Sequence, residues 1–190
     1  RITSIKCTIS NTSYTVWNNK ATQRSTTLKC TFPYTGIVIP DSVSCIGSGA
    51  FYDCKSLHSI VIPDSVSCIG DRVFFHCESL SSVVIPDGVT SIGDYAFSGC
   101  CSLTDIVIPD SVTSIGNEAF RGCSSLSSIV LSDGVTSIGF DTFGDCHSLS
   151  SLVVPDSVTS IGDCAFRGCG FLTNIGIPTS VTSIGNEAFD

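Results

Sequence analysis

The apolar residues of this chain recur with a period of 23 positions from residue 37 to residue 190. One unit, residues 106–128, reads Ile-Val-Ile-Pro-Asp-Ser-Val-Thr-Ser-Ile-Gly-Asn-Glu-Ala-Phe-Arg-Gly-Cys-Ser-Ser-Leu-Ser-Ser. One phenylalanine marks each unit, at Phe51, Phe74, Phe97, Phe120, Phe143, Phe166 and Phe189. A fixed period of this size is typical of a solenoid, in which each unit buries its apolar face against its neighbours.

The first half of each unit predicts a short strand and a turn. In the run 106–108, strand alternation places both isoleucines on the core side and Val107 on the opposite side. Because Pro109 has no N–H to donate, the strand is expected to end there in a Pro-Asp-Ser turn. Val112 and Ile115 are three residues apart, which points both inward on the return path.

The second half of each unit predicts one short helical or 3₁₀ turn over residues 118–121. Asn117 precedes this segment, and Asp or Asn at this place is a typical helix N-cap. The place of Gly122 holds only Gly, Asp or His in the other full units. These residues tolerate a left-handed backbone, as expected where such a turn ends. Cys123 and Leu126 complete the predicted core.

The pattern Leu-x-x-Ile-x-Ile-Pro-x-x-Val-x-x-Ile-Gly-x-x-Ala-Phe-x-x-Cys resembles the BspA-like, or Treponema-pallidum-type, leucine-rich repeat. The resemblance covers residues 37–190, as six full 23-residue repeats plus a partial one. It implies an α/β repeat solenoid, a right-handed arc with a parallel β-sheet on its concave side and the short helical or 3₁₀ turns on its convex side. It also implies a cell-surface or secreted protein that binds host proteins, other cells or glycans.

Residues 1–36 lack the repeat and differ in charge. They contain five Lys or Arg and no acid, whereas residues 37–190 contain all 17 acids and four bases, so the net charge of −8 divides into +5 and −13. Residues 5–9 and 28–32 share an alternating strand pattern, and residues 33–36 predict a hairpin turn. We therefore expect a hairpin-like N-terminal β cap. Because the chain starts with Arg1 and stops within a repeat, we also expect a piece of a longer protein.

The twelve cysteines fall into different groups. Six recur beside the inward leucine, where a small buried thiol packs well, and these are expected to be reduced: Cys54, Cys77, Cys100, Cys123, Cys146 and Cys169. Cys45 and Cys68 share one place in adjacent units, and Cys7 and Cys30 lie in the two N-terminal strands, so each pair is a candidate disulfide. The sequence has no Cys-x-x-Cys pair, which argues against a zinc site.

The sequence contains no constellation typical of an enzyme. Its three histidines occupy different repeat positions, and neither a Gly-x-Ser-x-Gly motif nor a glycine-rich phosphate loop occurs. We therefore predict no catalytic residue and no cofactor. An isoelectric point near 4.6 argues against nucleic acid as a partner. The sequence contains no run of 18 apolar residues, the length needed to span a membrane.

An aspartate recurs in the turn that follows each strand. Six carboxylates at this spacing could bind cations. However, Asp after Pro is also a standard turn residue, so we favour the turn and predict no metal site. The row is Asp41, Asp64, Asp87, Asp110, Asp133 and Asp156.

One further row of side chains is a candidate for recognition. On the strand face opposite the core, the valines are Val38, Val61, Val84, Val107, Val130 and Val153. They either reflect β-propensity alone or form an apolar stripe that binds a partner, a protein or glycan such as a host extracellular protein.

Three functions remain open at this point. The first is a non-catalytic, adhesin-like binding module at the cell surface or secreted, which the resemblance favours. The second is an intracellular scaffold or immunity-type binder, which cysteines expected to be reduced favour. The third is an accessory binding domain of a larger enzyme. The sequence does not predict an oligomeric state.

Overall fold

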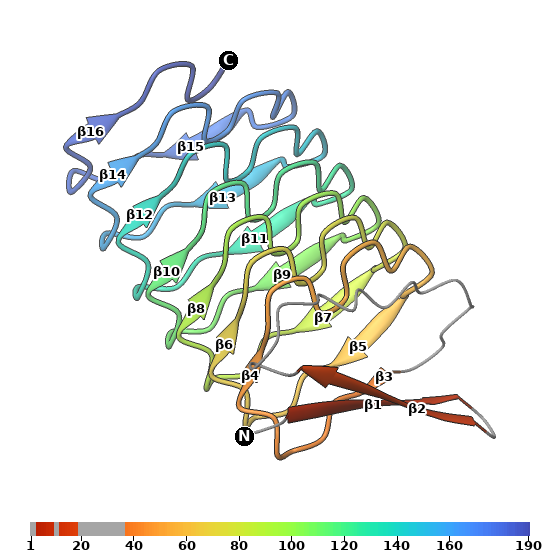
Figure 1. The fold of residues 1–190 in the computed structure, drawn as a ribbon. Coiled ribbons are helices and arrows are strands. Elements are labelled where there is room, and N and C mark those ends of the chain that lie inside the picture. The colour runs from red at the N-terminus through yellow and green to blue at the C-terminus, as the bar shows by residue number, and fades with distance from the viewer. Residues whose placement is uncertain (1–2, 10–11, 19–36) are drawn as a thin grey trace.

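The computed structural model describes residues 3–9, 12–18 and 37–190. From Ile37 onward the chain winds as a β-solenoid, and its coils stack in register (Figure 1). Each full coil contributes one strand to each of two parallel arrays. This arrangement confirms the repeat solenoid predicted from the 23-residue period.

The first array contains the strands predicted from the Ile-Val-Ile run. They are β3 (Ile37–Val38), β5 (Ser59–Val61), β7 (Ser82–Val84), β9 (Asp105–Val107), β11 (Ser128–Val130), β13 (Ser151–Val153) and β15 (Asn174–Gly176). Equivalent residues lie opposite each other, so Val130 pairs with Val107 on one side and Val153 on the other. The hydrogen-bonded ladder divides into β3-β5-β7 and β9-β11-β13-β15, and β7 and β9 remain neighbours in space.

The second array was not predicted. It is built on the return path by β4 (Cys45–Ile46), β6 (Cys68–Ile69), β8 (Ser91–Ile92), β10 (Ser114–Ile115), β12 (Ser137–Ile138), β14 (Ser160–Ile161) and β16 (Ser183–Ile184). Each strand is two residues long, which is too short to leave an alternating pattern of its own. Its inward residue was nevertheless recognised, because Ile115 is buried in the core as expected.

A spine of stacked phenylalanines runs through the core. Six of these side chains are almost completely inaccessible to solvent: Phe51, Phe74, Phe97, Phe120, Phe143 and Phe166. The ring centroids of Phe97 and Phe120 lie 5.3 Å apart with their planes 1° from parallel, a favourable offset stack. Burying each ring contributes roughly 1.5–3 kcal/mol, so the spine stabilises every coil through its two neighbours.

The expected helical or 3₁₀ turns are wrong, because the described residues contain no helix. Glu118 has a φ of 54°, a left-handed conformation that ends any right-handed turn. Alternate N–H groups donate to the next coil instead, from Glu118 to the Phe140 carbonyl at 2.9 Å and from Phe120 to the Thr142 carbonyl at 3.0 Å. Bonds to the next coil therefore alternate with single turns, such as the one that the Arg121 N–H closes on the Glu118 carbonyl at 3.2 Å, and no helix forms. No helix in the described part of the chain has the length and apolarity to cross a membrane.

The residue interpreted as a helix N-cap has a different role. Asp94 Oδ1 accepts the N–H of Asn117 at 2.7 Å, and Asn117 Oδ1 accepts the N–H of Phe140 at 3.0 Å. Each of these side chains therefore joins its coil to the next. The left-handed position predicted at Gly122 is confirmed, with a φ of 70° there and 57° at the equivalent Asp145.

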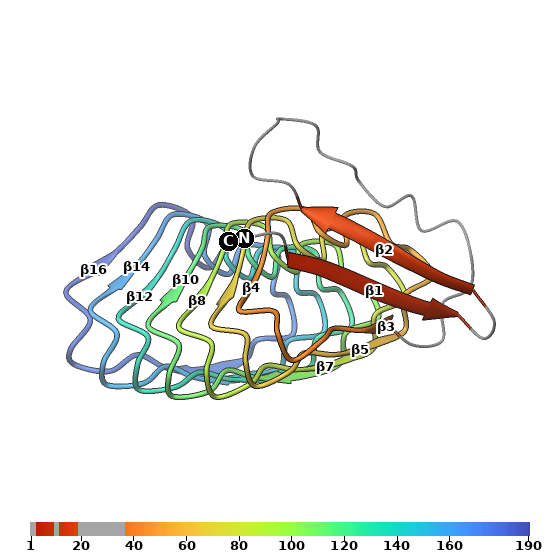
Figure 2. The same ribbon diagram turned by 60° about the horizontal axis from the view of Figure 1, so that its bottom comes forward.

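The N-terminal segment contributes an antiparallel pair, β1 (Thr3–Ile9) and β2 (Thr12–Asn18), and β1 lies next to β3 (Figure 2). The sequence predicted the first of these strands over residues 5–9 but missed the second, in which the adjacent Val16 and Trp17 break the apolar–polar alternation. The other predicted strand, 28–32, and the predicted hairpin turn, 33–36, lie outside the described residues.

Candidate binding face

The outward side of the first array presents one exposed valine per coil. We call this surface the valine face, and its residues are Val38, Val61, Val84, Val107, Val130 and Val153. Their exposed fractions run from 59% at Val130 to 79% at Val153, whereas Ile106 and Ile108 beside Val107 are buried. The valines therefore point away from the core, as strand alternation dictates.

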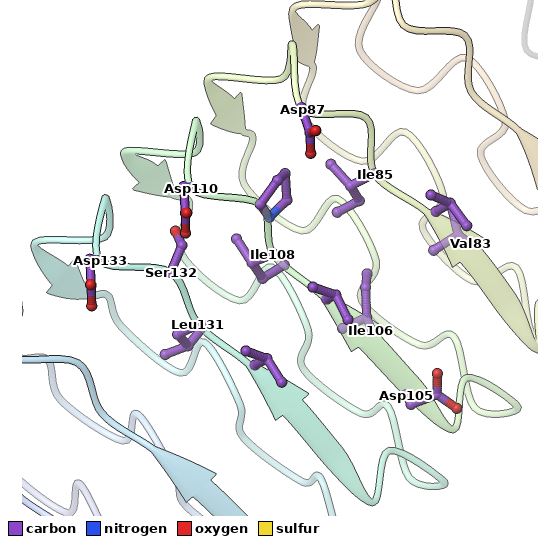
Figure 3. A pocket seen from close by; sticks show the side chains of 14 residues that line it. Val83, Ile85, Asp87, Asp105, Ile106, Ile108, Asp110, Leu131, Ser132 and Asp133 are labelled. Carbon is purple, nitrogen blue, oxygen red and sulfur yellow. The ribbon is translucent and has the colours of Figure 1, made fainter.

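An open depression of about 630 Å³ lies over the middle of the valine face (Figure 3). It is formed by β7, β9 and β11 and by the turns that follow these strands. Four exposed aspartates line it together with the valines: Asp87, Asp105, Asp110 and Asp133. Figure 3 shows Asp87, Asp110 and Asp133 in a row along one edge of the depression, and Asp105 at the opposite end, where β9 begins.

The turns hold the aspartate row in a fixed position. The N–H of Val112 donates to the carbonyl of Pro109 at 3.0 Å, which closes the turn that contains Asp110. The hydroxyl of Ser111 donates to the carbonyl of Val89 in the preceding coil at 2.7 Å. In the part of the chain that the structure describes, no group of three or more His, Cys, Asp or Glu side chains could hold a metal ion.

The bases of residues 37–190 lie in the turns that follow the second array, and most are already paired. The ion pairs include Lys55 with Glu78 at 2.6 Å, Arg121 with Glu118 at 2.9 Å and Arg167 with Asp141 at 3.4 Å, and the Arg72 guanidinium lies 4.7 Å from the ring centroid of Tyr95. Within the described residues, no base pairs with the four aspartates of the depression. The valine face therefore has unneutralised carboxylates on both sides of its apolar stripe.

A second row of side chains differs from coil to coil. It occupies the left-handed repeat position of Glu118. We call it the variable row, and its residues are Arg72, Tyr95, Glu118, Asp141, Cys164 and Glu187. Neighbours along it interact, because Arg72 lies over the ring of Tyr95 and a hydrogen bond to Glu118 raises the pKa of Tyr95. Arg121 then joins Glu118 to Asp141, whose Oδ2 lies 3.2 Å from Nε of the guanidinium.

Asp141 is the most deeply buried member of the variable row, with an exposed fraction of 1% against 8% at Glu118. Burial raises the pKa of its carboxyl, although Arg121 and Arg167 act in the opposite direction. Its side chain packs against Gly144, where a Cβ atom would collide with Asp141 Oδ1. Sequence reasoning missed this cluster. Its signal is that Thr142 stands where most other units have alanine, with Gly144 two residues later.

The inward cysteines form a ladder of buried thiols. Cys123 Sγ donates to the carbonyl of Phe97 in the preceding coil at 3.2 Å, and the other free members make the same bond. Burial raises the pKa of Cys77 to about 12, so this thiol stays protonated at neutral pH. Five of the six are free thiols, as expected, but Cys54 at the N-terminal end is disulfide-bonded.

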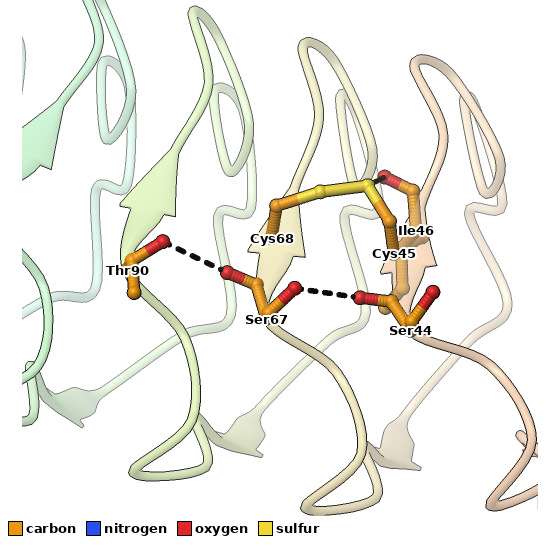
Figure 4. Close-up of a disulfide and its surroundings, with 6 residues drawn as sticks. All are labelled: Ser44, Cys45, Ile46, Ser67, Cys68 and Thr90. Atoms are coloured by element: carbon orange, nitrogen blue, oxygen red, sulfur yellow. Dashed lines mark hydrogen bonds between the residues drawn. A yellow bond between two sulfur atoms is a disulfide. The ribbon is translucent and has the colours of Figure 1, made fainter.

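Cys45 and Cys68 lie opposite each other in β4 and β6 and form a disulfide, with Cα atoms 4.8 Å apart (Figure 4). The other coils have serine at this place: Ser91, Ser114, Ser137, Ser160 and Ser183. The neighbouring hydroxyl of Ser67 donates to the carbonyl of Ser44 at 2.9 Å, which adds a second link between the same two coils. For the other candidate pair, Cys7 pairs with Tyr14 in the β1–β2 register, and Cys30 lies outside the described residues.

Stacked parallel coils around a phenylalanine spine, with one strand face repeated from coil to coil, define this chain as a leucine-rich repeat solenoid. The chain belongs to the BspA type leucine rich repeat family, whose model matches residues 22–113 and 90–190. A search of the curated proteins found no match.

Three solved structures are similar to this chain. A leucine-rich repeat protein from Bacteroides ovatus has 36% identity and a TM-score of 0.82 over 97% of this chain and 47% of its own. The T. pallidum leucine rich repeat protein has 36% identity and a TM-score of 0.76 over 79% of this chain and 72% of its own. A leucine rich cell surface protein from Faecalibacterium prausnitzii has 45% identity and a TM-score of 0.72 over 78% of this chain and 40% of its own. This chain therefore spans about half the length of the Bacteroides ovatus protein and less than half the length of the Faecalibacterium protein.

Proposed function

We propose that this chain is a non-catalytic, adhesin-like binding module that acts at the cell surface or in secreted form and docks a partner on the valine face. The observation that carries the proposal is the row of outward valines over an open depression. A contiguous exposed apolar surface is disfavoured in a soluble protein unless a partner covers it. We also propose that residues 1–36 cap the solenoid, since β1 lies beside its first strand.

Two observations support the surface location over an intracellular scaffold. One of the similar structures is described as a leucine rich cell surface protein. The chain also contains the Cys45–Cys68 disulfide, and disulfides persist in oxidising compartments. The buried thiols fit either location, because burial protects them from oxidants.

The geometry of the valine face supports its role in docking. Its side chains stand on strands held in register by pairing with at least one neighbouring coil, β7 with β5 and β9 with β11, so binding there loses little conformational entropy. We infer that this face is the concave side of the arc, which offers the largest continuous contact area in a solenoid. Each coil adds a small and similar contribution, and affinity then grows along the array.

The test is the paired substitution Val84→Lys and Val107→Lys, with binding measured on an array of extracellular-matrix proteins and glycans and on intact cells. Both side chains are mostly exposed, so the fold should be unchanged by circular dichroism. We expect binding to be abolished, because two charged side chains would replace the apolar contact at the centre of the interface and would lose hydration under a partner.

The matched controls are Tyr95→Ala and Phe140→Ala, which lie outside the depression. Binding that survives the valine changes but is lost in either control would place the partner on the turn side and refute the assignment.

A further inference from the structure

Negative charge is concentrated on the valine face, and the repetition of valine does not explain it. All described bases of residues 37–190 lie in the turns that follow the second array. The depression is lined by four exposed carboxylates and no base. The face therefore carries a local negative potential, and its four carboxylates are part of the net −13 of the repeats.

Asp105 makes this charge a feature of the middle coil rather than of the repeat. It occupies the first outward place of β9, where the other three-residue strands have Ser59, Ser82, Ser128, Ser151 and Asn174. Its carboxylate accepts only the hydroxyl of Thr104, at 2.9 Å, among the described residues. Turn formation explains the aspartates that follow the strands, but it does not explain a carboxylate at the start of a strand.

Asp105 and the turn aspartates lie on opposite sides of the apolar stripe. Figure 3 shows Asp105 at the start of β9 and Asp110 beyond its end, and Val107 lies between them in the sequence. A ligand that runs along β9 therefore meets a carboxylate, an isopropyl group and a second carboxylate in that order.

We propose that the partner on this face is a cationic polypeptide segment, with apolar side chains that cover the valines and Lys or Arg side chains that reach the flanking aspartates. This inference rests on the proposed docking role of the valine face. Anionic partners such as nucleic acid, acidic glycans or an anionic lipid surface are repelled by the same four carboxylates. Neutral sugars lack a stacking partner, because the side chains lining the depression include no aromatic ring.

Charge and apolar contact have separable effects at such a site. Exposed ion pairs are individually weak, so the aspartates act mainly on association rate and on the choice of partner. The valines supply the apolar contact that holds the segment after encounter. Binding should therefore need both features in one ligand and should weaken as ionic strength rises.

The test measures binding of labelled decapeptides to the whole chain by fluorescence anisotropy, at low and at physiological ionic strength. The probes are alternating Val-Lys, Val-Glu and Ser-Lys peptides. We expect the Val-Lys peptide to bind at least about tenfold more tightly than either of the others.

Two charge-matched triple variants locate the effect. Asp87→Asn, Asp110→Asn and Asp133→Asn remove three carboxylates that line the depression, whereas Asp41→Asn, Asp64→Asn and Asp156→Asn remove three from the same repeat position outside it. We expect the first triple variant to weaken the Val-Lys peptide about tenfold at low ionic strength and the second no more than about twofold. Asp105→Ser, which introduces the residue found in most neighbouring coils, should also weaken it.

The outcomes separate this inference from the proposed function. Equal binding of the Val-Lys and Val-Glu peptides, or equal effects of the two triple variants, would overturn the cationic partner. Tight binding of the Ser-Lys peptide would overturn the requirement for apolar side chains that cover the valines. If the cationic partner were overturned but Val84→Lys with Val107→Lys still abolished binding of the extracellular partner, the docking role of the valine face would stand. A loss of Val-Lys binding in the neutral variant Val84→Ser with Val107→Ser is expected if both proposals are right.

Discussion

The valine face and the variable row are built by the same coils, yet one repeats a single residue and the other changes at every step. Val130 sits in a strand that is paired on both sides, whereas Val84 and Val107 sit in β7 and β9, which are each paired on one side and lie next to each other. Tyr95 and Glu118 sit at left-handed positions whose N–H groups bond to the next coil. Both surfaces are therefore rigid, and rigidity alone does not decide which of them binds a partner.

The difference lies in how each surface treats its own charges and rings. Along the variable row the side chains satisfy one another, through Arg72 with Tyr95 and Arg121 with Glu118. On the valine face the aspartates of the depression pair with no base among the described residues, and the valine side chains are largely exposed to solvent. A surface whose groups are already paired gains less from a ligand than one whose groups are free. The comparison therefore favours the uniform face for binding.

Removal of one ring from the spine is expected to have the largest effect on both surfaces. Phe120→Ala should destabilise the chain by about 3–5 kcal/mol, because it leaves a cavity in a close-packed core. Glu118→Ala should cost about 1 kcal/mol or less, since Arg121 is partly exposed and retains its hydration and the carboxylates of Asp141 and Asp145. Chemical denaturation measures both. Equal unfolding midpoints for the two variants would show that the phenylalanine ladder does not hold the coils together.

Loss of the Cys45–Cys68 disulfide is the next largest expected effect. The bond closes a loop with a sequence separation of 23, for which chain entropy predicts a stabilisation of about 3 kcal/mol. Cys45→Ser with Cys68→Ser introduces the residue that later coils have, so native pairing of β4 with β6 should be retained. Hydrogen exchange should then show faster opening of the first two coils only. Equal acceleration along the whole solenoid would contradict a local role for the bond.

The two surfaces also differ in how far the sequence predicted them. The valine face follows from alternation within three residues, so Val107 outside and Ile106 inside could be read directly. The left-handed Glu118 could not, because its N–H bonds to Phe140, which is 22 residues away, and that pairing overrides the local preference for a helical turn. Asp141 could not be placed either, since the space for its side chain depends on Gly144 and its ion pairs come from two neighbouring coils. The disulfide candidate Cys45–Cys68 came from equal repeat positions, which adjacent coils bring together.

The buried carboxyl of Asp141 should give the variable row a measurable pH dependence. Burial raises its pKa above the ordinary value of 3.8, so the folded chain binds this proton more readily than the unfolded chain. Its contribution to stability is therefore full below the ordinary pKa and is lost as pH rises through the folded pKa. Asp141→Asn should remove this contribution, because the amide cannot ionise.

The measurement is the free energy of unfolding of wild type and Asp141→Asn between about pH 7 and about pH 3. The difference between the two chains isolates Asp141 from the other carboxylates. We expect the variant to gain relative to wild type as pH rises. Arg121 and Arg167 stay partly exposed and remain solvated after the change, with side-chain exposures of 38% and 36%. An advantage of the variant that grows as pH falls would mean that the two guanidinium groups outweigh burial.

Substitutions on the turn side of the coils, in and beside the variable row, are expected to have the smallest effect on binding affinity. Tyr95→Ala removes a ring that Arg72 already covers, and Phe140→Ala removes a half-exposed ring on the turn side of the coil. Neither residue lines the depression, so affinity for the Val-Lys peptide and for the extracellular partner should stay within about twofold of wild type. Isothermal titration with each variant checks this, and Val107→Ser is the positive control from the same array of coils. A tenfold loss in Tyr95→Ala with no loss in Val107→Ser would reverse the comparison, because the self-paired row would then be the surface that gives up its internal contacts to bind.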